Sequence, residues 1–250
     1  MGLLQDRVAI VTGAGGLHGI GRAIAHAYAR HGSRVAVAGG SAVDQVADEI
    51  RADGGTAVPI PCDVSSPGDV ERLVQRTEAE LGPIDILCNN AGILRRGHLH
   101  EITLDDWNRT LAVNLTGLFL CTQVVAARMT ARGAGGRIVN ISSLCGHQGC
   151  PGQVSYAASK AGVEGFTKSI AEDLGMHGIT ANCIAPGAVY TNMTGSPAPA
   201  GATPVRWNGA PLPDFGLPPD VAGAAVFLAS DLASWITAAT LIVDGGRLVQ

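Results

Sequence analysis

The chain has 250 residues, of which 46% are hydrophobic, and this is enough for one α/β domain with a large core. Its 17 basic and 21 acidic residues give a net charge of −4 without a basic block, which argues against nucleic acid or an anionic membrane as the main partner. Glycine is unusually frequent, with 34 residues or about twice the average usage, so many glycines should have specific positions in the backbone.

Strand-like apolar runs alternate with helical stretches along almost the whole chain. We expect strands at residues 7–12, 34–38, 56–61, 84–88, 137–142, 180–185 and 240–243, and helices at 20–31, 43–52, 69–81, 104–132, 155–177 and 219–230. This alternation predicts a single α/β domain (1–250) with a doubly wound parallel sheet of about seven strands and helices on both faces. The proline-rich segment 192–219 cannot be a regular helix for most of its length, and we expect it to be a mobile lid over the site.

A glycine-rich turn follows the first expected strand and opens the first expected helix. Gly15, Gly19 and Gly21 have the spacing G-x-x-x-G-x-G, and glycine lets a backbone turn sharply and approach a pyrophosphate at a helix N-terminus. The alternative is an ordinary glycine-rich turn, but the position between strand and helix favours dinucleotide binding. The residues expected to contact the cofactor here are Gly13, Gly15, His18, Gly19, Ile20 and Gly21.

The end of the second expected strand bears on the choice of cofactor. An acidic residue there would bind the ribose 2′-hydroxyl of NAD(H), whereas residues 38–41 of this chain read AGGS. No carboxylate is placed to repel a 2′-phosphate, and Ser41, His18 and Arg22 are available as hydrogen-bond donors. We therefore favour NADP(H) over NAD(H).

A serine, a tyrosine and a lysine stand at a spacing that suggests catalysis. Tyr156 and Lys160 are four residues apart and share one face of an expected helix. Ser143 follows the fifth expected strand, at the sheet edge where ligands bind in open α/β folds. A free tyrosine has a pKa of about 10, and the Lys160 ammonium, helped by a positive nicotinamide ring, would lower it. The alternative for the tyrosine and lysine is a solvated helix face.

Together these motifs resemble the short-chain dehydrogenase/reductase family, whose fold is of the Rossmann type. The resemblance covers nearly the whole chain and implies a reversible NAD(P)-dependent alcohol dehydrogenase or ketone reductase that acts on a small molecule. It also implies a homotetramer, or else a homodimer. The matching motifs are TGAGGLHGIG at 12–21, Asp63-Val64, NNAG at 89–92, Asn114, Ser143, Tyr156-x-x-x-Lys160, Pro186-Gly187 and VDGG at 243–246.

The resemblance assigns a role to each catalytic candidate. Tyr156 would be the acid/base, and Lys160 would also hold the nicotinamide ribose. Ser143 would hydrogen-bond the substrate oxygen, and Asn114 would support a water relay to Lys160.

It assigns further residues to the cofactor. Asp63 would bind the adenine amino group, although a simple turn residue is an equal interpretation, and a structural role is the better one for Asn90. The cofactor set away from the glycine turn is Ser41, Asp63, Val64, Asn90, Ala91, Gly92, Tyr156, Lys160, Pro186, Gly187, Val189 and Thr191.

The sequence departs from the family pattern at three places. The turn before Gly19 carries two extra residues, the segment 196–213 does not readily form the usual short helices over the substrate, and Ala238 stands where a glycine is usual. We expect the last of these to cause only a local backbone adjustment.

Three variable segments, 93–98, 144–153 and the lid, are expected to meet the substrate. Arg95 and Arg96 resemble a loop of sugar-acid members of the family and would steer a carboxylate, but a solvated surface pair is the favoured alternative. The substrate candidates are Arg95, Cys145, His147, Gln153 and Trp207.

The six cysteines are scattered singly, and we expect neither a secretory signal nor a membrane-spanning segment. We therefore interpret the cysteines as reduced thiols in a cytoplasmic protein. Cys145, His147 and Cys150 are three potential zinc ligands, but their spacing matches no common zinc module, so we expect no metal site. Two alternatives to a reductase are a dinucleotide-binding protein without turnover and an epimerase or dehydratase on the same scaffold.

Overall fold

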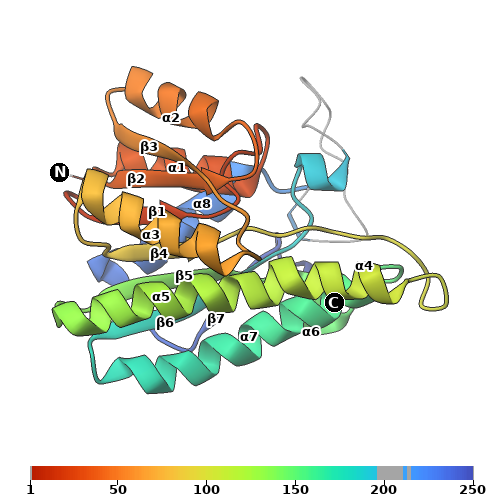
Figure 1. Cartoon of the computed structure of the whole chain (residues 1–250). Helices are drawn as coiled ribbons and strands as arrows, with labels where there is room; N and C mark the ends of the chain where they lie inside the picture. The colour runs from red at the N-terminus through yellow and green to blue at the C-terminus, as the bar shows by residue number, and fades with distance from the viewer. Residues whose placement is uncertain (1, 196–210, 213–214, 250) are drawn as a thin grey trace.

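The computed structural model describes residues 2–195, 211–212 and 215–249 and contains one sheet of seven parallel strands (Figure 1). Their spatial order is β3-β2-β1-β4-β5-β6-β7, so Ala9 of β1 pairs with Val35 of β2 on one side and Ile86 of β4 on the other. The predicted doubly wound parallel sheet is confirmed. The strands are β1 (Val8–Val11), β2 (Arg34–Gly39), β3 (Thr56–Pro61), β4 (Ile86–Asn89), β5 (Gly136–Ile141), β6 (Ile179–Pro186) and β7 (Thr240–Val243).

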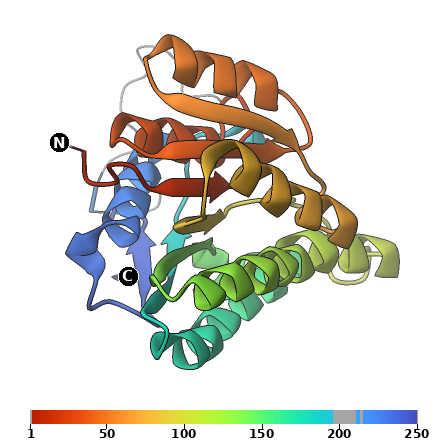
Figure 2. The ribbon, with the colours of Figure 1, turned by 60° about the vertical axis from the view of Figure 1, so that its left-hand side comes forward.

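Helices cover both faces of this sheet (Figures 1 and 2). One face is covered by α1 (Ile20–Arg30), α2 (Val43–Ala52) and α8 (Pro218–Ala229). The other is covered by α3 (Pro67–Leu81), α5 (Gly117–Arg132) and α7 (Val154–Gly175). The remaining helical segments are α4 (Leu104–Leu111), the π-helix Ala112–Thr116, α6 (Leu144–Gln148) and the short 3₁₀ turns Asn192–Thr194, Asp231–Ala233 and Arg247–Val249.

The alternation of side chains along β1 shows how the sheet separates two cores. Val8 and Ile10 pack with the side chains of α3 and α5, whereas Ala9 and Val11 pack with those of α1 and α8. All four side chains are fully buried. A strand covered on both faces needs an unbroken apolar run, which is why these strands were readable in the sequence.

Every strand and helix that the sequence predicts is present, with ends within two residues of the expected ones. The expected helix at 104–132 is one continuous helical stretch made of α4, the π-helix and α5. Ala238 has a left-handed backbone with φ +59°, the conformation that glycine adopts without cost. Of the predicted lid, Asn192–Thr194 form a 3₁₀ turn and residues 218–219 begin α8, while 196–210 and 213–214 lie outside the described residues.

Leu104–Arg132 is the one long apolar helical stretch among the described residues. By length and composition it is apolar enough to cross a membrane, with a mean hydropathy of 1.6 over its most apolar window, although no spanning segment was expected. Half of that window is buried inside the fold, as in the core helix of a globular protein.

Candidate active site

The glycine turn joins β1 to α1 at the carboxyl edge of the sheet. Gly13 has φ +64°, in the region where side chains are strained. A Cβ atom at Gly15 would lie 1.6 Å from the backbone oxygen of Ser41, and one at Gly21 would lie 2.6 Å from that of Gly13. The turn is thus packed too closely for side chains at these positions.

The N-terminus of α1 is open to an anion. Gly19 is the N-cap and provides no side-chain cap, and the first turn of the helix contains no acidic residue. The first amides of an α-helix have no partner within the helix, and the helix dipole makes this end positive. The turn and the helix start therefore fit the pyrophosphate of a dinucleotide.

The side chains near the expected 2′-phosphate position do not all face it. Ser41 is exposed after the end of β2, next to the exposed Gly40. Arg22, which was expected as a donor, forms an ion pair with Glu49 of α2 at 2.6 Å, and His26 contacts the same carboxylate oxygen at 3.2 Å. His18 lines a surface hollow beside Arg22.

Asn90 ties the loop after β4 to the turn after β1. Its Nδ2 donates to the backbone oxygens of Thr12 (2.9 Å) and Gly13 (3.2 Å). The Thr12 hydroxyl oxygen in turn accepts from the backbone amides of Asn90 (3.0 Å) and Ala91 (3.1 Å). β1 and β4 are the two strands between which the chain reverses its order in the sheet, so this brace holds the crevice where ligands bind in such folds.

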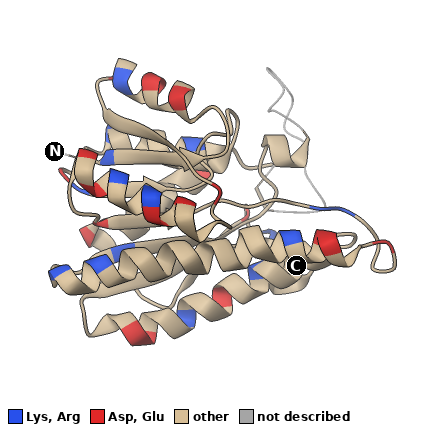
Figure 3. Ribbon diagram, viewed as in Figure 1, with Lys and Arg blue, Asp and Glu red and all other residues tan. Residues whose placement is uncertain are grey.

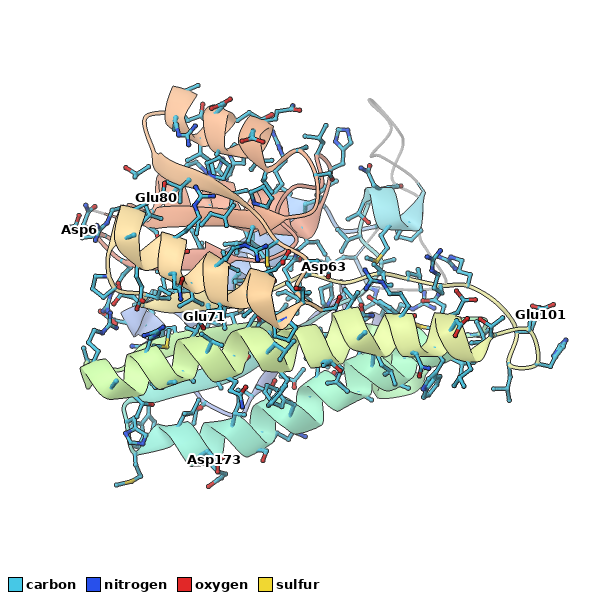
Figure 4. The ribbon with its side chains drawn as sticks, viewed as in Figure 1. Asp6, Asp63, Glu71, Glu80, Glu101 and Asp173 are labelled. Atoms are coloured by element: carbon cyan, nitrogen blue, oxygen red, sulfur yellow. A yellow bond between two sulfur atoms is a disulfide. The ribbon has the colours of Figure 1, made fainter. Side chains whose placement is uncertain are left out.

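Asp63, labelled in Figure 4, lies on the loop between β3 and α3. The Ser65 hydroxyl and amide donate to its Oδ1 at 2.6 and 3.0 Å, and Arg109 donates to its Oδ2 at 3.2 Å. These bonds, those from Ser65 foremost, hold the pKa of Asp63 below its usual range. The neighbouring Val64 is buried against Gly117 of α5.

The catalytic candidates converge from three elements. Tyr156 and Lys160 lie one turn apart on α7, and Ser143 follows β5 as the N-cap of α6. Lys160 is buried, its Nζ donates to the backbone oxygen of Ile141 at 2.7 Å, and it lies 5.7 Å from the centre of the Tyr156 ring.

The electrostatics of this group correct one expectation. Burial lowers the pKa of Lys160 from its ordinary value of 10.5 to about 8. Burial raises the pKa of Tyr156, and a hydrogen bond with the Ser143 side chain offsets this only in part. Without a cofactor, burial outweighs any lowering of the pKa of Tyr156, and the Lys160 ammonium donates to the Ile141 carbonyl instead.

Asn114 lies in the π-helix between α4 and α5. The residue was predicted from the sequence, but the π-helix was not. Its Oδ1 accepts from the Ile93 amide at 2.8 Å, and its Nδ2 donates to the Ile93 oxygen (3.0 Å) and to the Ser159 hydroxyl (3.1 Å). Both Asn114 Oδ1 and Lys160 Nζ lie beside Gly92. The single π turn places this buried amide within the site, which is a frequent use of π-bulges.

Two cavities meet at Ser143 and Tyr156. The smaller, of about 100 Å³, opens between the carboxyl ends of the central strands. The larger, of about 400 Å³, lies over the loop after β5. The smaller is lined by the expected cofactor residues Ile20, Asn90, Gly92, Lys160, Pro186, Gly187, Val189 and Thr191, together with Ile141, Ser142, Met193 and Thr194.

The larger cavity contains only some of the substrate candidates. Cys145 and Gln153 line it, and so does Arg96, whereas Arg95 lies 3.7 Å from Asp106 in an ion pair. His147 contacts Glu164 of α7 at 3.3 Å and does not line this cavity. Trp207 lies outside the described residues.

Several lining residues escaped the sequence analysis. These are Leu94, Met193 and Arg247, which line the larger cavity, whereas Gln148 and Phe215, also in its lining, belong to the segments expected to meet the substrate. The one available sequence signal was Ser143 as the N-cap of α6, whose hydroxyl accepts from the Cys145 amide at 3.2 Å. The other residues lie in segments whose positions depend on tertiary contacts.

The structure contradicts the expectation that all six cysteines are reduced thiols. Cys145 and Cys150 form a disulfide, with Cα atoms 5.2 Å apart, and Cys62, Cys88, Cys121 and Cys183 are free and buried. The physical reason is the short helix α6, which turns the chain back over the four intervening residues so that the two cysteines come within disulfide distance. The three potential zinc ligands therefore have other partners. The two cysteines are bonded to each other, and His147 contacts Glu164.

The parallel sheet, the open glycine turn and the Ser143–Tyr156–Lys160 cluster are those of an oxidoreductase with a doubly wound fold. Residues 13–247 match the family described as enoyl-(acyl carrier protein) reductase. The chain is 42% identical to the 3-oxoacyl-[acyl-carrier-protein] reductase of Synechocystis sp., over 100% of both chains. It is 42% identical to the acetoacetyl-CoA reductase of Shinella zoogloeoides, over 97% of this chain and 99% of the relative.

The comparison with solved structures agrees. The fold is similar to the crystal structure of a short-chain type dehydrogenase/reductase from Mycobacterium marinum, with a TM-score of 0.89, 35% identity and coverage of 100% of both chains. The chain belongs to the short-chain dehydrogenase/reductase family, and the resemblance stated from its motifs is confirmed.

Proposed function

We propose that the protein is an NADP(H)-dependent oxidoreductase that interconverts a ketone or aldehyde and an alcohol, with Tyr156 as the acid/base. The observation that carries this proposal is the meeting of the two cavities at Ser143 and Tyr156, with Lys160 buried on the side of the smaller one. A cofactor in the smaller cavity and a substrate in the larger would have their reacting ends side by side.

The residues of the site suit the oxygen chemistry of such a reaction. The nicotinamide, when bound, supplies or takes up the hydride at the substrate carbon. Tyr156 then gives a proton to the substrate oxygen or takes one from it, and Ser143 donates a hydrogen bond to the same oxygen. Because Lys160 has a pKa of about 8, it can exchange protons near neutrality, and Asn114 holds the Ile93 backbone close by as one wall of a proton path.

The choice of NADP(H) rests on the end of β2. Gly40 and Ser41 are exposed there and no carboxylate follows the strand, so nothing repels a 2′-phosphate. Arg22 is paired with Glu49, so the donors to such a phosphate would be Ser41 and the backbone rather than a guanidinium.

The substrate class that fits best is a 3-oxoacyl thioester. Two relatives are named for such substrates, one carried by acyl carrier protein and one by coenzyme A. The larger cavity combines apolar side chains, among them Leu94, Met193 and Phe215, with Arg96 near its rim. Arg96 forms no ion pair within the described residues, so it is available for an anionic group.

The remaining features of the proposal follow the family. We place the protein in the cytoplasm, as one domain with 192–219 over the substrate, and in a homotetramer. The metal-free chemistry above needs no ligand cluster, and among the described residues no group of three His, Cys, Asp or Glu side chains is placed to hold a metal.

The test is a substrate panel with both cofactors. Acetoacetyl-CoA, a simple 2-ketone and crotonyl-CoA are each offered with NADPH and with NADH, and cofactor absorbance is followed. We expect turnover of acetoacetyl-CoA, a higher kcat/KM with NADPH, and no reduction of the crotonyl double bond. Cofactor binding without turnover of any carbonyl compound would instead support a dinucleotide-binding protein without catalysis.

A further inference from the structure

The disulfide between Cys145 and Cys150 closes the loop that follows the catalytic candidate Ser143. Both cysteines are partly exposed and both line the larger cavity. The loop they close contains α6, which starts at Ser143 as its N-cap. The bond is therefore part of the wall against which the substrate would lie.

The loop is also held to α7 by a second contact. His147 Nε2 lies 3.3 Å from Glu164 Oε1, and the same oxygen accepts from the Ser142 hydroxyl at 2.8 Å. Glu164 is buried, one turn beyond Lys160 on α7. The first half of the loop is thus fixed without the disulfide.

The second half of the loop leads from the disulfide to the other wall of the cavity. After Cys150 the chain runs to Gly152, whose backbone oxygen accepts from the Gly97 amide at 3.1 Å, and Gly97 forms a bridge with Gln153. Gly97 follows Arg96 directly, so this pairing positions the opposite wall of the cavity. The Cys145–Cys150 bond joins the wall at Ser143 to the wall at Arg96.

The other four cysteines are unsuited to oxidation. All are buried, and burial raises the pKa of Cys62 and Cys183 to about 11 and that of Cys88 and Cys121 to about 12. Thiolates are the reacting species in thiol–disulfide exchange, so these side chains are protected by both access and protonation. Oxidation of the folded protein would be confined to the exposed pair.

We propose that Cys145 and Cys150 are a site of reversible thiol oxidation that controls substrate affinity. The oxidant is a low-molecular-weight or protein disulfide. A thiolate of the pair attacks it and releases one thiol, and the second cysteine then displaces the other, so that two thiols of the protein become one disulfide and the oxidant becomes two thiols. In reducing compartments such bonds are usually transient and redox-sensing.

The effect on activity rests on the proposed function, whereas the chemistry of the pair does not. Reduction leaves the segment 150–153 held by its backbone contacts with Gly97 and α7 alone, so this wall is less constrained and the substrate must order it when it binds. We expect KM to rise roughly fivefold on reduction, as for the ordering of one or two side chains or a short loop. We expect kcat to change by less than about twofold, because Tyr156 and Lys160 are on α7 and not on the loop.

The chemistry is tested first and without any substrate. The protein is equilibrated in mixtures of reduced and oxidised glutathione, trapped with a thiol reagent in denaturant, and digested with trypsin. No lysine or arginine stands between Arg137 and Lys160, so both cysteines lie in one peptide, residues 138–160. We expect four reactive thiols in the oxidised protein and six in the reduced one, with the difference confined to this peptide. Six thiols in every mixture would overturn the proposal.

The control of affinity is tested next, with kinetics on both redox forms. Cys150→Ser should have the KM of the reduced enzyme whether or not oxidised glutathione is present, and Cys121→Ala should respond like the wild type. The Kd for NADPH should be the same in both forms, because the smaller cavity is not closed by the loop. An equal KM in the oxidised and reduced wild type would contradict the proposed control. A complete lack of turnover with an intact thiol response would refute only the proposed function.

Discussion

At the scale of single residues, the burial of Lys160 is the costly feature of the site. An amine that is taken out of water holds its proton less tightly, and among the described residues the Ile141 carbonyl is the hydrogen-bond acceptor of this ammonium. Such a cost is typical of a functional position. The lysine should therefore reduce the stability of the protein while it serves the chemistry.

This cost predicts a pH dependence of stability. The folded pKa of about 8 is lower than the ordinary value of 10.5. Below about pH 8 the lysine is protonated in both states and the burial cost is fully present. Between the two pKa values only the unfolded chain keeps the proton, so the free energy of unfolding should rise with pH, by at most about 1.4 kcal/mol per pH unit.

The measurement is denaturant unfolding of the cofactor-free wild type and of Lys160→Met from about pH 7 to about pH 10. The other titrating groups are common to both proteins and cancel in the difference. We expect the wild type to gain stability relative to the variant above about pH 8. A difference that stays constant over this range would show that the lysine is not desolvated.

At the scale of elements, the glycine turn is the part whose shape is most restricted. Gly15 lies against the backbone oxygen of Ser41, so the turn after β1 and the end of β2 are in direct contact. A side chain at Gly15 would have to push these two backbone segments apart, and both belong to the proposed cofactor site. Other glycines of the chain have open space around them, Gly223 of α8 among them.

Two matched glycine substitutions test this contact. Gly15→Ala should weaken NADPH binding by at least roughly tenfold, because backbone shifts of this size disrupt close phosphate contacts. Gly223→Ala, the control, should keep the affinity and gain up to about 1 kcal/mol of helix stability. Isothermal titration with NADPH measures the affinity, and equal affinities in the two variants would refute the proposed role of the turn.

The order of the elements was predictable because strands covered on both faces need continuous apolar runs, and because glycine and proline mark the ends of helices. The elements that were not predicted from the sequence are short. The π-helix at Asn114 depends on the two hydrogen bonds of its amide to Ile93, a segment 21 residues away. Helix α6, five residues long, is held by its N-cap Ser143 and by the His147–Glu164 contact. Local sequence gives no sign of the π-helix, and for α6 it offers only the N-cap residue Ser143.

At the scale of the whole molecule, the charges and the apolar residues on the surface are unevenly placed. Figure 3 shows the middle of the helical stretch formed by α4 and α5 without charged residues, and residues 110–127 contain none. Phe119 of this stretch is 40% exposed and stacks edge-on with Phe166 of α7. Beside the edge strand β7, Trp235 is fully exposed as well. Such apolar surfaces favour assembly.

The assembly expected from the family leads to a test on this surface. We expect light scattering to give the mass of four chains of 25.4 kDa for the wild type. Phe119→Asp should give a smaller species, because a carboxylate would be buried at the interface. Leu99→Asp, which changes an exposed leucine on the loop before α4, should leave the mass unchanged. A monomeric wild type would contradict the expected tetramer.

The catalytic residues of the candidate site were predictable from the sequence, and the residues of the substrate cavity were predictable only in part. Ser143, Tyr156 and Lys160 were named from their residue types and spacing and Asn114 from the family resemblance, and the structure brings all four together. The lining of the larger cavity was not predicted in the same way, because it is formed mostly by loops. There the chain exposes Arg96 to the cavity and turns Arg95 toward Asp106, and it pairs His147 with Glu164. Arg95 and Arg96 are equivalent in the sequence, and only the folded loop determines which of them lines the cavity.

The central claim is that Tyr156 transfers the proton while the cofactor is held by other parts of the site. The most direct measurement compares Tyr156→Phe with the wild type in two assays on the same preparation, the Kd for NADPH and the rate of carbonyl reduction. We predict a loss of turnover of roughly a hundredfold or more, the usual contribution of a general acid, with a Kd within about twofold of the wild type. Turnover close to that of the wild type, or an equal loss of binding and turnover, would contradict the account.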